Sequence, residues 1–201
     1  MFFFQSDAAA KSGIRVLVLG NSLTAGYGLK KADAFPIKLE TALRKMGWKI
    51  SITNAGVSGD TTAGGLSRLN WALSENPHLV LVELGANDGL RGLDPIETRR
   101  NLNAILVNLQ KKNIKVLLAG MLAPPNLGKQ YSNKFNGIYA ELSVLHKIKL
   151  YQFFLEGVAN RPHLNQADGI HPNAKGVDEI VRRILPSVIT LLKSIKCSNC
   201  S

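Results

Sequence analysis

A serine, an aspartate and a histidine occur in this sequence in settings that suit nucleophilic catalysis. Ser22 follows an apolar segment and a glycine, where a strand is expected to turn sharply into a helix. Asp168 and His171 are three residues apart, so the carboxylate can reach the imidazole Nδ1 and fix the tautomer whose Nε2 accepts a proton. A serine hydroxyl is a weak nucleophile unless such a base takes its proton. These residues predict acyl transfer through a serine nucleophile.

Acyl transfer also needs hydrogen-bond donors for the oxyanion that forms on the substrate. Gly56 offers an unobstructed backbone N–H, and Asn87 offers a side-chain amide after Gly85 and Ala86. Each residue also has an ordinary explanation, since Ser22 suits a helix cap, Gly56 a turn and Asn87 an Asx turn. The occurrence of all of them in one chain favours the catalytic interpretation.

The fold must bring these residues together, and the apolar pattern predicts a parallel sheet covered by helices on both faces. Short runs rich in β-branched residues alternate with longer helical patterns. The expected strands span residues 14–19, 49–53, 79–84, 115–119 and 150–153, and the expected helices span 35–46, 61–73, 96–112, 131–147 and 174–193. Pro186 is expected to kink or break the last helix near Leu185.

This order of elements predicts a single site. Ser22, Gly56 and Asn87 come just after the first three strands, and ligand sites of open parallel sheets lie at the carboxyl ends of the strands. The segment with Asp168 and His171 leads into the last helix, and right-handed crossovers can return it to the same edge. A helix-capping role for the residues around His171 stays open.

Length and composition favour one globular domain. The 201 residues are 45% hydrophobic and 19% charged, and no apolar run approaches the roughly 20 residues of a membrane helix. We expect the domain to span 13–193, with 1–12 as a leader or trimmed export signal and 194–201 as a flexible tail. A monomer is expected. The leader favours a periplasmic or secreted location, with the cytoplasm as the alternative.

The net charge of +11 comes from basic residues spread over several expected helices. A solvated basic surface is therefore favoured, nucleic acid is not expected as a partner, and weak association with anionic lipid stays the second interpretation. The two cysteines, Cys197 and Cys200, lie in the tail without the further ligands that a zinc site needs.

Four segments together resemble the SGNH (GDSL-like) hydrolase family, and within it the small branch of arylesterases, acyl-CoA thioesterase I and lysophospholipase L1. The resemblance covers nearly everything from Ile14 to about Leu192. Its blocks are residues 20–28 (GNSLTAGYG), 54–62 (NAGVSGDTT), 84–92 (LGANDGLRG) and 168–173 (DGIHPN). Four blocks in register are much more specific than any one of them.

The resemblance implies an α/β fold, a three-layer α/β/α sandwich of the flavodoxin-like kind with a mainly five-stranded parallel sheet. It implies Ser22 as nucleophile, His171 as base and Asp168 as its orienting acid. It implies an oxyanion hole from the N–H groups of Ser22 and Gly56 and the side chain of Asn87, with no metal or organic cofactor. The family usually has Asp where this chain has Asn21. We expect the near-isosteric Asn to be tolerated, and Asn21→Asp to keep or raise activity.

The expected walls of the site are apolar, which suits an acyl chain or aryl group better than a sugar. We predict that Leu90, Leu122 and Pro124 bind substrate. Flanking residues that share this character, or pack in the core instead, are Met121, Ala123, Pro125 and Leu127. A small-molecule acyl ester or thioester is thus the expected substrate, lysophospholipids included. The alternatives are a carbohydrate O-acetyl esterase, a non-catalytic lipid-binding protein and a nucleotide-binding module, although the chain has no P-loop ending.

Overall fold

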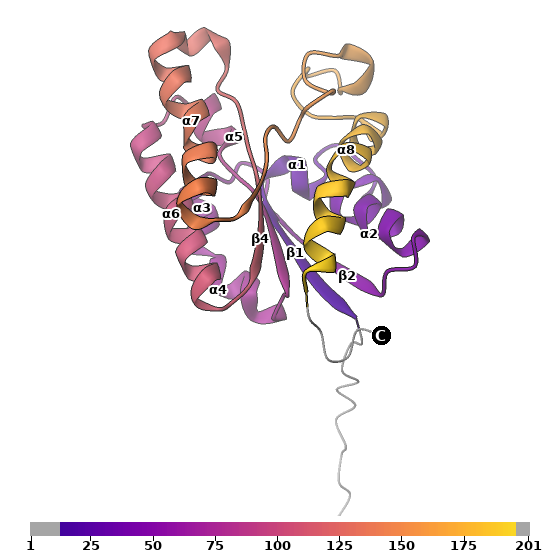
Figure 1. The fold of residues 1–201 in the computed structure, drawn as a ribbon. Helices are drawn as coiled ribbons and strands as arrows, with labels where there is room; N and C mark the ends of the chain where they lie inside the picture. Colours follow the sequence, from indigo (N-terminus) through magenta and orange to yellow (C-terminus); the bar gives the residue numbers. More distant parts are fainter. Residues whose placement is uncertain (1–12, 196–201) are drawn as a thin grey trace, which may run out of the picture.

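The computed structural model describes residues 13–195, which form a parallel five-stranded sheet between two layers of helices (Figure 1). The expected leader at 1–12 lies outside these residues. So do residues 196–201 of the expected tail, which include Cys197 and Cys200. Within residues 13–195, no helix has the length and apolar character needed to cross a membrane.

The strands are β1 (Ile14–Gly20), β2 (Ile50–Gly56), β3 (Leu79–Glu83), β4 (Lys115–Ala119) and β5 (Lys149–Tyr151). The helices are α1 (Ser22–Ala25), α2 (Phe35–Lys45), α3 (Thr62–Ser67), α4 (Leu69–Ala72), α5 (Ala86–Leu90), α6 (Pro95–Lys111), α7 (Gly128–His146) and α8 (Ala174–Lys193). Short 3₁₀ turns are η1 (Lys31–Asp33), η2 (Leu73–Glu75), η3 (Pro125–Leu127) and η4 (Pro162–Leu164). The predicted α/β/α sandwich is confirmed.

The sheet has the strand order β2-β1-β3-β4-β5, and every neighbouring pair is parallel. The chain runs from β1 outward to β2 and then returns to place β3 on the other side of β1. The direction of winding therefore reverses between β1 and β3. In open α/β sheets, ligands bind in the crevice outside the carboxyl ends of the strands at such a reversal.

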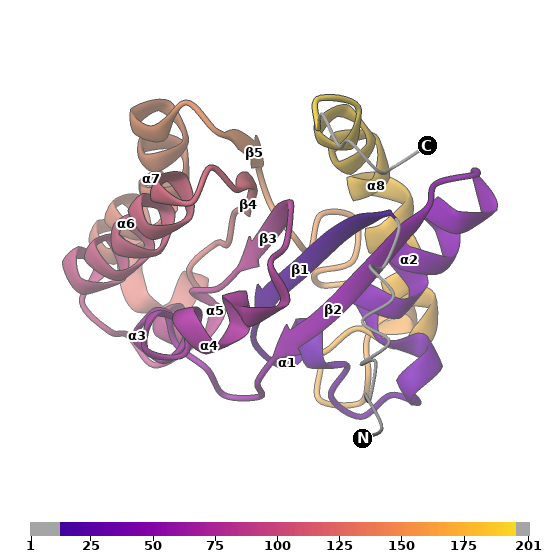
Figure 2. The same ribbon diagram turned by 90° about the horizontal axis from the view of Figure 1, so that it is seen from below.

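Burial explains why these segments are strands. All five residues of β3 are buried, as are four of the five in β4, because helices cover both faces of a central strand. The edge strand β2 instead alternates between buried and more exposed positions over its first residues. The helices α2 and α8 cover one face, while α3, α6 and α7 cover the other (Figures 1 and 2).

Most predicted elements are confirmed to within a few residues, with two exceptions. The expected helix over 61–73 is divided into α3, α4 and η2, with Arg68 at the junction between the two α-helices. Of the kink or break expected near Leu185, the break is wrong, because α8 continues through Pro186. A helix that packs along the sheet can tolerate the loss of one backbone hydrogen bond.

Two glycines allow the backbone to pack closely where β1 and β2 end. A Cβ atom on Gly20 would lie 2.0 Å from Thr24 Oγ1, and one on Gly56 would lie 2.3 Å from the Ala25 nitrogen. Gly20 and Gly56 are register partners in neighbouring strands. The absence of side chains at both positions therefore lets α1 sit directly on the ends of the two strands.

We predict that Gly56→Ala destabilises the protein by about 1–3 kcal/mol, because the new methyl group must displace α1. The matched control is Gly137→Ala, in the interior of α7, where the nearest atom to the new Cβ is the flexible Glu141 Oε1 at 3.4 Å. This control should stabilise the helix by about 0.5–1 kcal/mol. Urea unfolding of both variants measures the difference, and equal effects would contradict the packing argument.

Candidate active site

Ser22, His171 and Asp168 form a chain of hydrogen bonds at the carboxyl end of the sheet. The Ser22 Oγ lies 2.9 Å from His171 Nε2, although the two residues are 149 positions apart in the sequence. The other ring nitrogen, His171 Nδ1, lies 2.6 Å from Asp168 Oδ2. Thus the first residue of α1, just beyond β1, supplies the hydroxyl, and the segment before α8 supplies the imidazole and the carboxylate.

A local turn holds Asp168 toward the imidazole. Asp168 Oδ1 accepts the backbone N–H groups of Ile170 at 2.9 Å and His171 at 3.0 Å, while Oδ2 faces the ring. These hydrogen bonds lower the pKa of the Asp168 carboxyl to about 2, mainly through the His171 backbone N–H and then the His171 ring. Asp168 is therefore ionised at neutral pH.

Two neighbours restrict the imidazole further. The Tyr27 ring packs against the His171 ring with 4.6 Å between the ring centres. The capping role left open for this segment belongs to Asn173, whose side chain accepts the N–H groups of Lys175 and Gly176 at the start of α8. His171 is thus free of a capping role.

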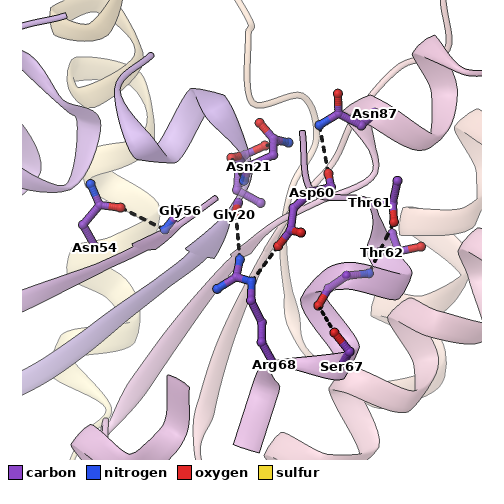
Figure 3. A network of polar contacts seen from close by, with 12 residues as sticks. Gly20, Asn21, Asn54, Gly56, Asp60, Thr61, Thr62, Ser67, Arg68 and Asn87 are labelled. Atoms are coloured by element: carbon purple, nitrogen blue, oxygen red, sulfur yellow. Dashed lines mark hydrogen bonds and ion pairs between the residues drawn. The ribbon is translucent and has the colours of Figure 1, made fainter. Parts of the chain in front are cut away.

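Asn87 lies in the first turn of α5, at the crevice beyond the strand ends that Ser22 also lines, and its side chain is anchored. Its Nδ2 donates to the backbone carbonyl of Asp60 at 2.8 Å (Figure 3). An amide nitrogen carries two hydrogens, so the second remains for another acceptor. The next residue, Asp88, is buried and accepts the Thr62 N–H at 2.9 Å and the Thr62 hydroxyl at 2.6 Å. These contacts fix α5 to the start of α3.

Arg68 connects the two sides of this crevice. Its Nε donates to Asp60 Oδ2 at 2.5 Å, and its Nη2 donates to the Gly20 carbonyl at 2.9 Å (Figure 3). Gly20 is the last residue of β1, and Asp60 is the residue whose carbonyl holds Asn87. One guanidinium group therefore sets the end of β1 against the segment that orients Asn87.

Gly56 does not present the free donor expected from the sequence. Its N–H donates to the side chain of Asn54 at 2.9 Å, and Figure 3 shows this contact on the far side of Asn21 from Asn87. The observed role of Gly56 is the close approach to α1. Gly59, to which the sequence analysis gave no role, lies in a turn closed by the Asp60 N–H on the Val57 carbonyl. This turn leads directly into the carbonyl that binds Asn87.

A cleft of about 420 Å³ opens beside Ser22, Asn87 and His171. It is bounded by the segments that follow β1, β3, β4 and β5 and by the turn before α8. Of the described residues that line it, none is Lys, Arg, Asp or Glu. The apolar residues in its wall are Leu23, Ala86, Leu90, Met121, Leu122, Ala123, Pro124, Pro125, Phe153, Leu155, Ala159 and Ile170.

The predicted substrate-binding residues Leu90, Leu122 and Pro124 all line this cleft. Leu127, also expected near the site, lies instead in a neighbouring hollow with Tyr131. Phe153, Leu155, Ala159 and Asn160, which the segment after β5 contributes to the cleft, are not among the residues predicted from the sequence. Their position just beyond a strand end was the available signal. Within residues 13–195, no group of three or more His, Cys, Asp or Glu side chains is placed to hold a metal ion.

Comparison with known proteins agrees with this arrangement. The GDSL-like Lipase/Acylhydrolase family matches residues 18–178. The chain belongs to this family. It is 40% identical to an arylesterase of Vibrio mimicus over 173 residues, which cover 86% of each chain. It is 42% identical over 159 residues to a protein of Escherichia coli K12 named thioesterase 1/protease 1/lysophospholipase L1, covering 79% of this chain and 75% of that one.

A solved structure supports the same membership. The SGNH-hydrolase family esterase AlinE4 is 51% identical and superimposes with a TM-score of 0.76, covering 90% of this chain and 97% of AlinE4. The expected SGNH fold and family are therefore confirmed. Like its named relatives, this family member is a carboxylic ester hydrolase.

We predict that the hydrogen bonds of the ionised Asp168 carboxylate stabilise the fold at neutral pH and cease to do so as the pH falls towards 2. Because folding lowers the pKa of Asp168 from 3.8 to about 2, its stabilising contribution is complete above about pH 5 and is lost as the pH falls from 4 towards 2. The difference in unfolding free energy between the wild type and Asp168→Asn should shrink over that interval. Urea unfolding at half-unit pH steps measures it, and a constant difference down to pH 2 would contradict the prediction.

Proposed function

We propose that the protein hydrolyses esters with an apolar acyl or aryl group through a covalent acyl-enzyme on Ser22. The observation that carries the proposal is the continuous path of hydrogen bonds from Ser22 Oγ through the His171 ring to Asp168. His171 is the proposed base, and Asp168 orients its ring and stabilises the imidazolium that forms. All three side chains are at hydrogen-bonding distance without any rearrangement.

The proposed reaction has two steps. Ser22 Oγ attacks the acyl carbon while its proton passes to His171 Nε2. When the tetrahedral intermediate collapses, the bond to the leaving alcohol breaks and His171 returns the proton to that alcohol. A water molecule then attacks the acyl-enzyme, again giving its proton to His171. The carboxylic acid leaves and Ser22 regains its hydrogen.

For the oxyanion we propose the Ser22 N–H and the free hydrogen of Asn87 Nδ2 as donors. Ser22 is the first residue of α1, so its N–H has no carbonyl to meet within the helix. For a third donor we favour Gly59 over Gly56. The Gly56 N–H already donates to the Asn54 side chain. Gly59, in contrast, directly precedes Asp60, whose backbone carbonyl accepts from the Asn87 side chain.

The uncharged cleft supports apolar acyl and aryl esters as the substrate class. A phosphate-rich ligand would meet no Lys or Arg among the described lining residues, and a sugar would face a wall in which apolar side chains outnumber polar ones by twelve to six. Activity on p-nitrophenyl esters and acyl-CoA thioesters of graded length, and on lysophospholipids, would define the range. Faster turnover of acetylated sugars than of any of these would favour the O-acetyl esterase alternative.

Monomeric state, weak association with anionic lipid and an extracytoplasmic location stay predictions.

We predict that Ser22→Ala and His171→Ala each abolish ester hydrolysis, and that combining them costs hardly more, because such residues act as a unit. A fluorophosphonate probe should label the wild type and fail to label Ser22→Ala. The matched control is Ser67→Ala, which removes an exposed hydroxyl that donates to the Gly64 carbonyl and should leave labelling unchanged. Substantial turnover by folded Ser22→Ala would refute the proposed nucleophile.

We predict that Asn87→Ala lowers kcat by about 10²–10³-fold with little change in KM, the usual effect of removing one oxyanion donor. Asn108→Ala is the control, since Asn108 makes a similar side-chain contact to a carbonyl, that of Ala104, within α6. Steady-state kinetics on one p-nitrophenyl ester suffices. An unchanged kcat would contradict the proposed role of Asn87 as an oxyanion donor.

A further inference from the structure

The loops at the carboxyl edge of the sheet do not carry the net charge of +11. The segments that follow the strands, up to α2, α3, α6, α7 and α8, are 21–34, 57–61, 84–94, 120–127 and 152–173. Together they contain six acidic and four basic residues. The excess of lysine and arginine therefore lies away from the cleft, and the opposite edge of the sheet holds a large share of it.

Five lysines gather at that opposite edge, where α6 and α7 end and β4 and β5 begin. We call them the lysine corner; they are Lys111, Lys112, Lys115, Lys147 and Lys149. The helices α6 and α7 lie side by side (Figures 1 and 2), and β4 pairs with β5. The two helix ends are in direct contact, because Gln110 Nε2 donates to the His146 carbonyl at 2.8 Å. The lysines thus share one corner of the molecule.

No acidic residue neutralises the lysine corner. Segments 111–115 and 144–149 contain neither Asp nor Glu, and each of the five lysines is exposed. Within residues 13–195, none of the five takes part in an ion pair. The last acidic residue of α7, Glu141, binds Arg99 at 3.3 Å. The corner therefore presents five positive charges without local partners.

Lysines at helix ends have an ordinary role, since they complement the partial negative charge of the last carbonyl groups. Each helix end carries about half an elementary charge, so the ends of α6 and α7 together offset about one lysine. About four positive charges remain after this correction. The helix dipoles therefore do not account for the lysine corner.

Two exposed aliphatic side chains lie beside these lysines. Val144 is 77% exposed and Leu145 is 59% exposed, both in the last turn of α7. Among the large hydrophobic residues of the described chain, Val144 is the most exposed. Apolar side chains at this degree of exposure gain free energy when an apolar layer covers them. A partner that offers negative charge above an apolar layer would satisfy both features.

The residue types favour a lipid surface over a nucleic acid. Nucleic-acid grooves commonly add arginine and aromatic side chains that stack on bases. Segments 111–115 and 144–149 contain no Arg, Phe, Tyr or Trp. Lysines around exposed aliphatic side chains are instead typical of elements that lie in the interface of an anionic membrane.

We propose that the lysine corner binds the surface of an anionic phospholipid layer. The lysine ammonium groups meet the phosphate headgroups, and Val144 and Leu145 enter the layer between them. Because the corner lies at the amino end of the sheet, the cleft beside Ser22 faces away from the lipid and stays open to substrate from solution. This binding goes beyond ester hydrolysis and does not depend on the proposed nucleophile.

The test compares two pairs of adjacent, exposed lysines. Lys111→Gln with Lys112→Gln removes two charges from the corner, and the control, Lys30→Gln with Lys31→Gln, removes two from the carboxyl edge. The wild type should co-sediment with phosphatidylcholine vesicles only when these contain phosphatidylglycerol. The corner variant should bind about 10- to 30-fold more weakly, since each lysine near an anionic surface strengthens binding about fivefold. The control should lose less than about threefold, because charges beyond the Debye length are screened.

A second variant tests the aliphatic part of the surface. Val144→Ser with Leu145→Ser should weaken vesicle binding at least about tenfold, while the need for phosphatidylglycerol stays. All of these positions are exposed and lie outside the cleft, so each variant should keep the urea midpoint of the wild type and its rate on a soluble p-nitrophenyl ester.

Three results would overturn the proposal. The wild type could ignore vesicles that contain phosphatidylglycerol, or the two lysine pairs could lose equal affinity, which would show that binding follows net charge alone. Duplex DNA could also bind more tightly than the vesicles, with no effect of the serine substitutions, which would assign the corner to nucleic acid. Failure of the proposed function is distinguishable, since vesicle binding by Ser22→Ala reports on the corner without any turnover.

Discussion

The ends of β1 and β2 pack so closely against their neighbours that only glycine fits at positions 20 and 56. Gly20 faces the Glu83 carboxyl and Thr24, and Gly56 faces the backbone of α1. This packing directs the chain sharply from β1 into α1 and leaves the Ser22 hydroxyl at the rim of the cleft. Every other part of the site is placed relative to this turn. Arg68 binds the Gly20 carbonyl directly, and His171 reaches Ser22 from the far end of the chain.

Two carboxyl groups on opposite sides of Ser22 illustrate how environment divides similar groups between tasks. Asp168 is partly exposed, and local backbone N–H groups and the His171 ring lower its pKa, which keeps it ionised beside the imidazole. Glu83 is fully buried, and burial raises its pKa. The first suits a group that stabilises a developing positive charge, and the second suits a group that holds a turn.

The hydrogen-bonded groups of the site and its apolar walls come from different parts of the fold. Short backbone and side-chain contacts hold Ser22, Asn87 and their neighbours to the ends of β1 and β3, where the winding of the sheet reverses. The apolar walls come mainly from the segments after β4 and β5. Substitutions in those segments can change which acyl group fits while the hydrogen-bonded groups stay in place, consistent with the placement of function on loops over a fixed scaffold.

The sequence alone determined the sheet, most of the helices and the residues that meet at its carboxyl edge, because hydrophobic periodicity and turn chemistry are local properties. Asp168 and His171 were predictable as a pair for the same reason, since three residues of turn separate them. Only the tertiary structure decided which polar groups are engaged by residues far away in the sequence. The Gly56 N–H is taken by Asn54, Tyr27 packs on the imidazole, and Asn21 donates to Glu83 across 62 positions of sequence. Whether a polar group is free or engaged depends on partners that only the packed chain brings within hydrogen-bonding distance.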